Sequence, residues 1–528
     1  MKQLGSRYRS AALRRPPPYL LIVPALVGIS MLLPLVYLAV RAFEGDPQVL
    51  MELVFRRRTA ELLLNTLLLT AGVLGLTTLI GLPLAWLTTR ASIPFKRTIT
   101  ILSVMPLAVP GYVMAYSLLS LGGTNGLLAS IGFPIPRPTG LLGATIALSL
   151  YSFPYMFLNI RASILGMDPA TEESARSLGM RPARVFISVV VPMLTPGLVA
   201  GWLIVTLYTL GDFGAVALMR YEVFSYVIYT QYVGAFDRVY ASALALMLLV
   251  LTSIPVILEA RLLRSGRFAR IGSGVARRAH LIRTGAWSPL AWAFLIVVFG
   301  ASLGLPIFTL VYWMVLRSPV PQLASVASAF LNSAQAAAPA AALAVLLAIP
   351  IAYLRVRFPS HRTFLAERTA YIGYAIPPLA LALAMVFFSL RAAPFLYQRL
   401  PLLIVAYTLN FLALAMGPIR SSLLKTPRRI EEAARSLGFG PVRAFFTTVL
   451  PAMRSGIVGA LLLVFVMAMK ELPMAALLAP TGFRTLSVAV FTRTSEAMAA
   501  QAAPYAAAIV LFSSMFVGLV LRYEGKGH

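Results

Sequence analysis

Residues 172–197 read EESARSLGMRPARVFISVVVPMLTPG, and residues 431–456 read EEAARSLGFGPVRAFFTTVLPAMRSG. The two stretches lie 259 residues apart and share 13 of 26 residues. Farther upstream the pairing continues at an offset of 267 residues, where Asn65 pairs with Asn332. An internal repeat of this kind determines the architecture, so the chain is predicted to consist of two similar halves.

The composition indicates a membrane protein. Of the 528 residues 59% are apolar and only 12% are charged, whereas soluble domains are about 25% charged. This excludes a soluble enzyme, a disordered chain and a secreted disulfide scaffold. Cysteine is absent, and the histidines His280, His361 and His528 lie far apart, so thiolate chemistry is excluded and a histidine metal site is not expected.

Twelve stretches are long and apolar enough to cross a bilayer, which takes about 20 residues. They cover residues 19–40, 62–89, 98–121, 141–163, 190–211, 240–260, 288–316, 331–354, 370–390, 400–419, 455–478 and 503–521. Six spans in each half give both halves the same orientation, so the repeats are parallel. The prolines Pro24, Pro83, Pro110, Pro350 and Pro377 are expected to kink these helices.

The net charge of +28 is distributed unevenly along the chain. With the N-terminus in the cytoplasm, 32 of the 45 Lys and Arg residues lie at cytoplasmic ends of the spans. This positive-inside pattern predicts that both termini are cytoplasmic. The basic residues are scattered over seven segments, which favours anionic lipid headgroups over nucleic acid as their partner. The apolar run at 19–40 is too long for a signal peptide and is expected to be the first span.

The repeat and the charges predict three regions. Residues 1–260 form the first half with a loop at 168–192, residues 261–287 form a basic cytoplasmic linker, and residues 288–528 form the second half with a loop at 427–451. Each loop is expected to begin with a short helix, because Pro169 or Pro427 and a pair of glutamates suit a helix start. Gly179 and Gly438 suit its C-terminal stop.

The loops also carry a recognisable pattern. The second loop has Glu432-Ala433-Ala434, three residues, Gly438, nine residues and then Thr448-Val449-Leu450-Pro451. The first has Glu173-Ser174-Ala175, Gly179 and Val189-Val190-Val191-Pro192. Both resemble the EAA signature of binding-protein-dependent ABC importer permeases. The departures from that signature are mild: Ser174, Val189 and Val191 in the first loop and Thr448 in the second.

The resemblance implies an all-α membrane fold of about 12 transmembrane helices in two parallel six-helix repeats, the type I ABC importer permease fold. It implies that the loops are coupling helices that dock on a cytoplasmic ATPase, through Glu172, Glu173, Ala175, Gly179, Glu431, Glu432, Ala434 and Gly438. Two loops in one chain imply two ATPase copies. A substrate-binding protein at the outer face and a bacterial inner membrane are implied as well.

The chain has no GxxxxGK[ST] motif, so ATP and Mg²⁺ are expected on the partner ATPase, with no cofactor and no catalytic residue in this chain. A secondary transporter is the alternative of another class, but it would leave the repeated loops without a role. A membrane-embedded enzyme would lack any His or Cys cluster.

The end of each half resembles the ferric-iron permeases more narrowly. The stretches are Gly211-Asp212-Phe213-Gly214-Ala215-Val216 and KELPMAALLAP at 470–480, which departs from the family at Met474, Ala475 and Ala479. The resemblance implies ferric iron as the substrate, with thiamine, a polyamine or another small solute as alternatives.

Asp212 and Glu471 share the 259-residue offset at the predicted outer ends of spans 5 and 11. Acidic residues near a membrane core are functional candidates, and carboxylates suit a hard cation. They are therefore predicted to belong to the outer gate or substrate path. The alternative is a polar contact at a helix end. The sequence assigns no metal ligands.

Overall fold

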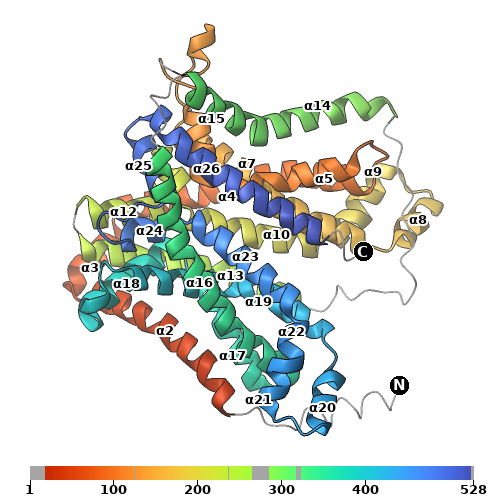
Figure 1. Cartoon of the computed structure of the whole chain (residues 1–528). Coiled ribbons are helices and arrows are strands. Elements are labelled where there is room, and N and C mark those ends of the chain that lie inside the picture. The colour runs from red at the N-terminus through yellow and green to blue at the C-terminus, as the bar shows by residue number, and fades with distance from the viewer. Residues whose placement is uncertain (1–17, 125, 236, 265–284, 317–322, 525–528) are drawn as a thin grey trace. The chain divides into compact units, whose positions relative to one another are not determined.

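A computed structural model of the chain describes residues 18–264, 285–316 and 323–524, apart from residues 125 and 236, and its regular elements in these ranges are helices (Figure 1). The helices up to residue 264 are α2 (Pro18–Phe43), α3 (Pro47–Phe55), α4 (Arg57–Thr89), α5 (Lys96–Val104), α6 (Gly111–Leu119), α7 (Gly140–Gly166), α8 (Pro169–Ser177), α9 (Pro182–Val185), α10 (Val191–Gly211), α11 (Gly214–Leu218), α12 (Phe224–Val233) and α13 (Arg238–Arg264).

The later helices are α14 (Ser288–Phe299), α15 (Leu305–Leu316), α16 (Leu323–Arg357), α17 (His361–Ala375), α18 (Pro378–Ala392), α19 (Leu400–Lys425), α20 (Arg428–Ser436), α21 (Pro441–Ala444), α22 (Leu450–Ala452), α23 (Arg454–Met469), α24 (Pro473–Leu478), α25 (Leu486–Ser495) and α26 (Ala499–Glu524). Short 3₁₀ turns lie at Met105–Ala108, Ala129–Ile131, Gly285–Trp287 and Pro394–Leu396, and π-helical turns lie at Phe186–Val190, Gly300–Gly304 and Phe445–Val449.

The predicted all-α membrane class is confirmed. Within the described ranges, nine helices are long and apolar enough to span a membrane, and the number rises to 12 if each of three bent helix pairs counts as one span. The stretches 98–121 and 370–390 are such pairs, bent by 90° and 100°, rather than continuous helices. The expected span 455–478 is wrong at its end, because α23 stops at Met469 and a separate helix begins at Pro473.

Two of the bends lie where the sequence places a proline. Val109 precedes Pro110 and Ile376 precedes Pro377, and both residues are extended, with ψ of 110° and 126°. The ring of a proline clashes with a helical conformation of the preceding residue, which forces that residue out of the helix. The prediction of kinks at Pro110 and Pro377 is confirmed.

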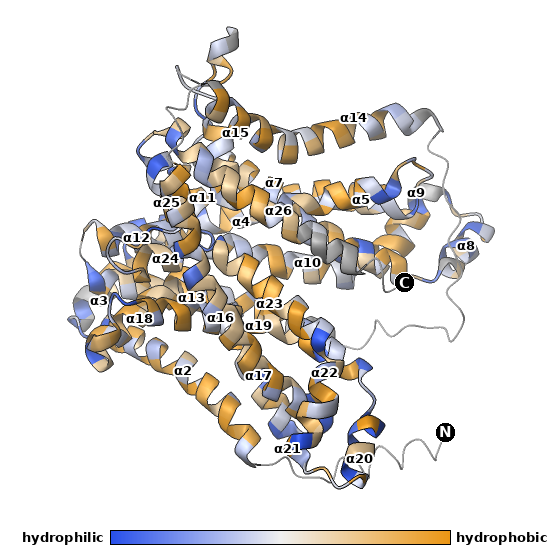
Figure 2. Cartoon of the chain, in the orientation of Figure 1, coloured by the Kyte–Doolittle hydropathy of each residue, from blue (hydrophilic) through white to orange (hydrophobic). Residues whose placement is uncertain are grey.

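Many large apolar side chains on the long helices point outward. Leu79 is 70% exposed, Ile296 is 68% exposed and Leu511 is 71% exposed. Figure 2 shows hydrophobic residues along most of the long helices and hydrophilic ones concentrated at short helices such as α8. A soluble protein would not leave so many such side chains in water, so these surfaces face lipid.

The described chain divides into two compact units. One contains the described parts of residues 1–51, 231–246 and 322–489, and in it α2 packs on α16, α17 and α18. The other contains the described parts of residues 52–230, 247–321 and 490–528, and in it α15 packs on α26 and α6. Each unit thus combines helices from both halves of the sequence repeat. The predicted linker 261–287 lies mostly outside the described residues.

Equivalent glycines allow close helix packing in the two halves. A Cβ atom added to Gly197 on α10 would lie 2.7 Å from the Cβ of Ser163 on α7. A Cβ atom added to Gly456 on α23 would lie 2.4 Å from the Cβ of Ser422 on α19. Small residues at such crossings let helix backbones approach, which is how membrane helices gain packing energy. The helix that follows each repeated loop is therefore held firmly against the helix that precedes it.

Candidate functional site

Each repeated loop contains a short helix that ends at a left-handed glycine. These loop helices are α8 and α20. Gly179 and Gly438, which follow them in the chain, have φ of +79° and +86°. The N–H groups of each glycine and of the next residue donate to carbonyls of the helix, at 2.9 and 3.3 Å in the first loop and 3.0 and 3.1 Å in the second. This is a Schellman motif, so the predicted helix stop is confirmed in both loops.

A π-helical turn follows each loop helix at the same place in the repeat, at Phe186–Val190 and at Phe445–Val449. Each turn comes shortly before a proline, Pro192 or Pro451. A proline ring collides with the carbonyl of an ordinary helical turn behind it, and the wider π turn gives the ring room. The loop therefore enters the next long helix through a distorted turn that the repeat preserves.

Buried ion pairs attach both loop helices to the ends of long helices. A guanidinium nitrogen of Arg90, just after α4, lies 3.5 Å from a carboxylate oxygen of Glu172 on α8. A guanidinium nitrogen of Arg357, at the end of α16, lies 3.5 Å from a carboxylate oxygen of Glu431 on α20. All four residues are only 4 to 7% exposed. The first glutamate of each loop thus holds the loop helix against its own unit.

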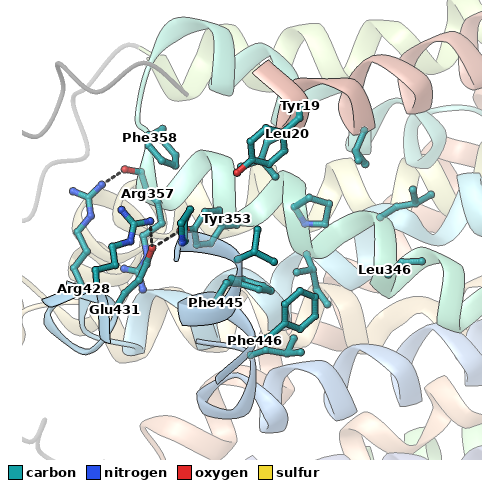
Figure 3. A pocket seen from close by; sticks show the side chains of 18 of the residues that line it. Tyr19, Leu20, Leu346, Tyr353, Arg357, Phe358, Arg428, Glu431, Phe445 and Phe446 are labelled. Atoms are coloured by element: carbon teal, nitrogen blue, oxygen red, sulfur yellow. Dashed lines mark hydrogen bonds and ion pairs between the residues drawn. The ribbon is translucent and has the colours of Figure 1, made fainter. Parts of the chain in front are cut away.

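The second loop is attached by more contacts than the first. The Tyr353 hydroxyl donates to Glu431 at 2.7 Å (Figure 3). Arg435 donates to the same carboxylate at 2.9 Å. In the first loop Trp86 occupies the place of Tyr353 and has no hydroxyl to donate. The aromatic packing is nonetheless alike. Tyr353 meets Phe445 edge-on with ring centroids 5.3 Å apart, and Trp86 meets Phe186 edge-on with ring centroids 5.2 Å apart.

The eight predicted docking residues separate into an inward and an outward set. Glu172, Ala175, Glu431 and Ala434 are buried against the unit that carries them. Glu173, Gly179, Glu432 and Gly438 are exposed. The outward set can contact a partner protein, whereas the inward set packs the loop helix against its own unit.

Two exposed leucines and two buried arginines were missed by sequence reasoning. Leu178 is 83% exposed and Leu437 is 79% exposed, and both lie next to the outward glycines. A leucine repeated at the end of a short polar helix could have signalled an apolar contact for a partner. Arg90 and Arg357 could have been found because they correspond at the 267-residue offset of the repeat.

Asp212 and Glu471 each bind the start of a short helix. The Asp212 carboxylate accepts from the backbone N–H groups of Ala215 at 2.9 Å and Val216 at 3.4 Å. The Glu471 carboxylate accepts from Met474 at 3.0 Å and Ala475 at 3.2 Å. Both groups thereby satisfy N–H groups that a helix start leaves unpaired. Their role in a gate or substrate path stays a prediction.

The backbone carbonyls of the same two acids are bound alike. Ser225 donates to the Asp212 carbonyl and Ser487 donates to the Glu471 carbonyl, both at 2.6 Å. The repeat thus preserves a whole arrangement around each acid and not the carboxylate alone.

We expect Asp212→Ala and Glu471→Ala each to lower the free energy of unfolding by about 0.5–2 kcal/mol, because each removes a helix cap. Asn and Gln at these positions keep one acceptor oxygen and should cost less. Thermal unfolding of the purified chain measures this cost, with the exposed Glu496→Ala as the control. If the amide variants unfold normally but lose transport, the acids act in the gate. If they also transport normally, the acids are only caps.

No three His, Asp or Glu side chains gather into a metal-binding group in the part of the chain that the structure describes. The features that the described residues repeat in both halves include the two loops, the two capped helices and the two glycine crossings.

Comparison with known proteins matches both halves. Residues 77–266 and 342–523 match the family described as binding-protein-dependent transport system inner membrane component. The chain is 33% identical over 522 residues to an Fe(3+)-transport system permease protein, FbpB 2, of Haemophilus influenzae, covering 97% of this chain and 100% of that protein.

Other relatives match a shorter part. The molybdenum transport permease ModB of Escherichia coli is 33% identical over 158 residues, which are 29% of this chain and 69% of ModB. The sulfate transport permease CysT of Salmonella typhimurium is 31% identical over 198 residues, which are 36% of this chain and 70% of CysT. With the family domain matched twice and a relative aligned from end to end, the chain belongs to the binding-protein-dependent ABC transport permeases of the inner membrane, as a fused protein that carries both halves.

Proposed function

We propose that this chain is the permease subunit of an ATP-driven importer of ferric iron. The observation that carries the proposal is the alignment over essentially the whole of both chains with an Fe(3+)-transport permease. In this scheme a binding protein delivers the ion at the outer face, and the chain provides the path through the membrane.

The two loop helices are proposed to dock on two copies of a separate cytoplasmic ATPase, which holds ATP and Mg²⁺. The exposed Glu173 and Glu432, the glycine turns and the exposed Leu178 and Leu437 form the docking surface. The buried Arg–Glu pairs support this surface by fixing each loop helix to its long helix. Both termini and both loops then lie in the cytoplasm, as the positive-inside charge pattern predicts.

A second candidate is the same role for an oxyanion, because the molybdenum and sulfate permeases also match. Those matches cover only 29% and 36% of the chain, whereas the match to the Fe(3+)-transport permease covers 97%. Thiamine or a polyamine would be a further small solute for the same machinery.

The test uses the chain reconstituted in proteoliposomes with a partner ATPase and a binding protein from the same organism. We expect the ferric-loaded binding protein to stimulate ATP hydrolysis and iron uptake, and native mass measurement to give one chain with two ATPase subunits. Stimulation by a binding protein loaded with molybdate, sulfate, thiamine or a polyamine would overturn the assignment of ferric iron as the substrate. It would leave the assignment as an importer permease intact. One ATPase per chain would overturn the docking scheme.

A further inference from the structure

A cavity of about 1060 Å³ lies beside the second loop helix, within the unit that contains α2, α16 and α20. This is at the upper end of ligand pockets, which are about 300–1,000 Å³. Its body is apolar, with walls from α2, α16 and the helical segment after the loop. Leu20, Leu346 and Phe446 belong to these walls (Figure 3), and so do Val23, Ile349 and Leu450.

One end of the cavity is lined by charged side chains, with more basic than acidic ones. Arg357, Arg428 and Arg435 line it together with Glu431 and Glu432. The Glu431 carboxylate is already compensated, because it lies against Arg357 and accepts from Tyr353 and Arg435. A guanidinium has five N–H donors. Arg428 donates to the Arg357 carbonyl and Arg435 donates to Glu431, each through one nitrogen, so both guanidinium groups retain donors for a ligand. This end therefore suits a phosphate, which arginine binds with several parallel hydrogen bonds.

The apolar body of the cavity is continuous with the lipid-facing surface. Leu346 is 64% exposed and Phe446 is 59% exposed, and both belong to its wall. Tyr19, at the start of the first span, is 54% exposed and also lines it. Tyrosines at span ends commonly lie at the level of lipid headgroups. An acyl chain can thus enter from the bilayer while its headgroup stays at the basic end.

We propose that this cavity binds an anionic glycerophospholipid from the leaflet on the side of the repeated loops. Its phosphate lies against Arg428 and Arg435, and an acyl chain lies along Val23, Leu346 and Phe446. Such a lipid would touch the first span, the end of α16 and the loop helix together. It would therefore join α20 to α2 through a molecule that the membrane supplies.

The two loops differ at this site. In the first loop Pro169 stands where the second has Arg428, and Trp86 stands where the second has Tyr353. A proline brings no positive charge for a headgroup. The proposed site belongs to the second loop, which makes the two loops unequal in their dependence on lipid.

The experiment is a lipid titration of the full-length chain, delipidated in detergent, followed by native mass spectrometry. We expect the first dioleoyl phosphatidylglycerol to bind about tenfold more tightly than phosphatidylcholine with the same acyl chains, since charge-assisted hydrogen bonds discriminate by about that factor. Arg428→Gln should remove this preference. Arg429→Gln is the matched control, because Arg429 is the exposed neighbour that does not line the cavity.

A second variant tests the apolar part without touching charge. Leu346→Trp should fill the cavity and weaken the first binding event for both lipids. Equal binding of both lipids by the wild type, or an equal effect of the two arginine variants, would overturn the proposal. Competition by glycerol 3-phosphate as strong as that of the lipid would point to a soluble phosphate ligand instead. Tight lipid binding only after deletion of residues 1–17 would make the chain's own N-terminus the occupant.

Discussion

Arg90→Gln is expected to destabilise the chain more than Arg357→Gln, although the two arginines occupy equivalent places in the repeat. Removing one partner of a buried ion pair leaves an uncompensated charge and costs about 3–5 kcal/mol. After Arg90→Gln, the ion pair left to Glu172 among the described residues is with Arg176, at 4.0 Å and with an arginine side chain 47% exposed. The full penalty should therefore appear in the first loop.

In the second loop, other donors still compensate the glutamate when the arginine is replaced. After Arg357→Gln, Glu431 still accepts from Tyr353 at 2.7 Å and from Arg435 at 2.9 Å. Hydrogen bonds to a charged group are worth about 1.5–3 kcal/mol each, so the loss should fall to about 1–3 kcal/mol. The double variant Tyr353→Phe with Arg357→Gln should lose nearly as much free energy of unfolding as Arg90→Gln does.

These effects are measured by thermal unfolding of the purified chain and by tryptic cleavage at the exposed Arg184 within the first loop. The control is Arg57→Gln, whose ion pair with Glu61 has side chains 93% and 55% exposed and is worth about 0–1 kcal/mol. The double variant Arg90→Gln with Glu172→Gln removes both charges and should recover most of the loss. Equal destabilisation by Arg57→Gln and Arg90→Gln would show that the buried pairs do not hold the loops.

Features that depend on a few adjacent residues could be predicted from the sequence. The helix stops at Gly179 and Gly438 follow from local backbone chemistry, as do the breaks at Pro110 and Pro377. The end of α23 was missed because residues 455–478 are almost uniformly apolar. The signal there was Glu471 two residues before Pro473, which is an acceptor followed by a good first residue for a helix.

Features that depend on tertiary packing could not be predicted in the same way. Arg90 and Glu172 lie far apart in sequence, and nothing local to either shows that they meet. The inward direction of Glu172 and Glu431 likewise depends on which face of a nine-residue helix packs on the unit. The sequence also did not show that each unit contains helices from both halves of the repeat. Hydropathy identifies a span but not the helices that pack against it. The repeat was the best available signal for the buried ion pairs, since an arginine and a glutamate occur at corresponding positions in both halves.

Gly438→Asp and Gly179→Asp are expected to abolish transport while leaving membrane insertion intact. Both glycines have positive φ, which costs other residues about 1–2 kcal/mol. A Cβ atom at either position meets nothing within 4 Å, so no packing is disturbed inside the chain. The new carboxylate instead projects from the proposed docking surface beside the exposed leucine. Burying an unpaired charge in an interface should weaken ATPase binding by at least about tenfold, or 1.4 kcal/mol.

Two further substitutions separate backbone strain from the docking surface. Gly438→Ala imposes the same backbone strain without charge and should retain most of the ATPase binding. Gly440→Asp adds the same charge two residues away, at a glycine with φ of −61° and open space around its Cβ. Co-purification of the ATPase and substrate uptake are measured for all variants. If Gly438→Ala is as defective as Gly438→Asp, the loop acts through its turn geometry. If the Asp variants bind the ATPase and transport normally, these turns do not lie in the contact, and the two loops lose their assignment as docking elements.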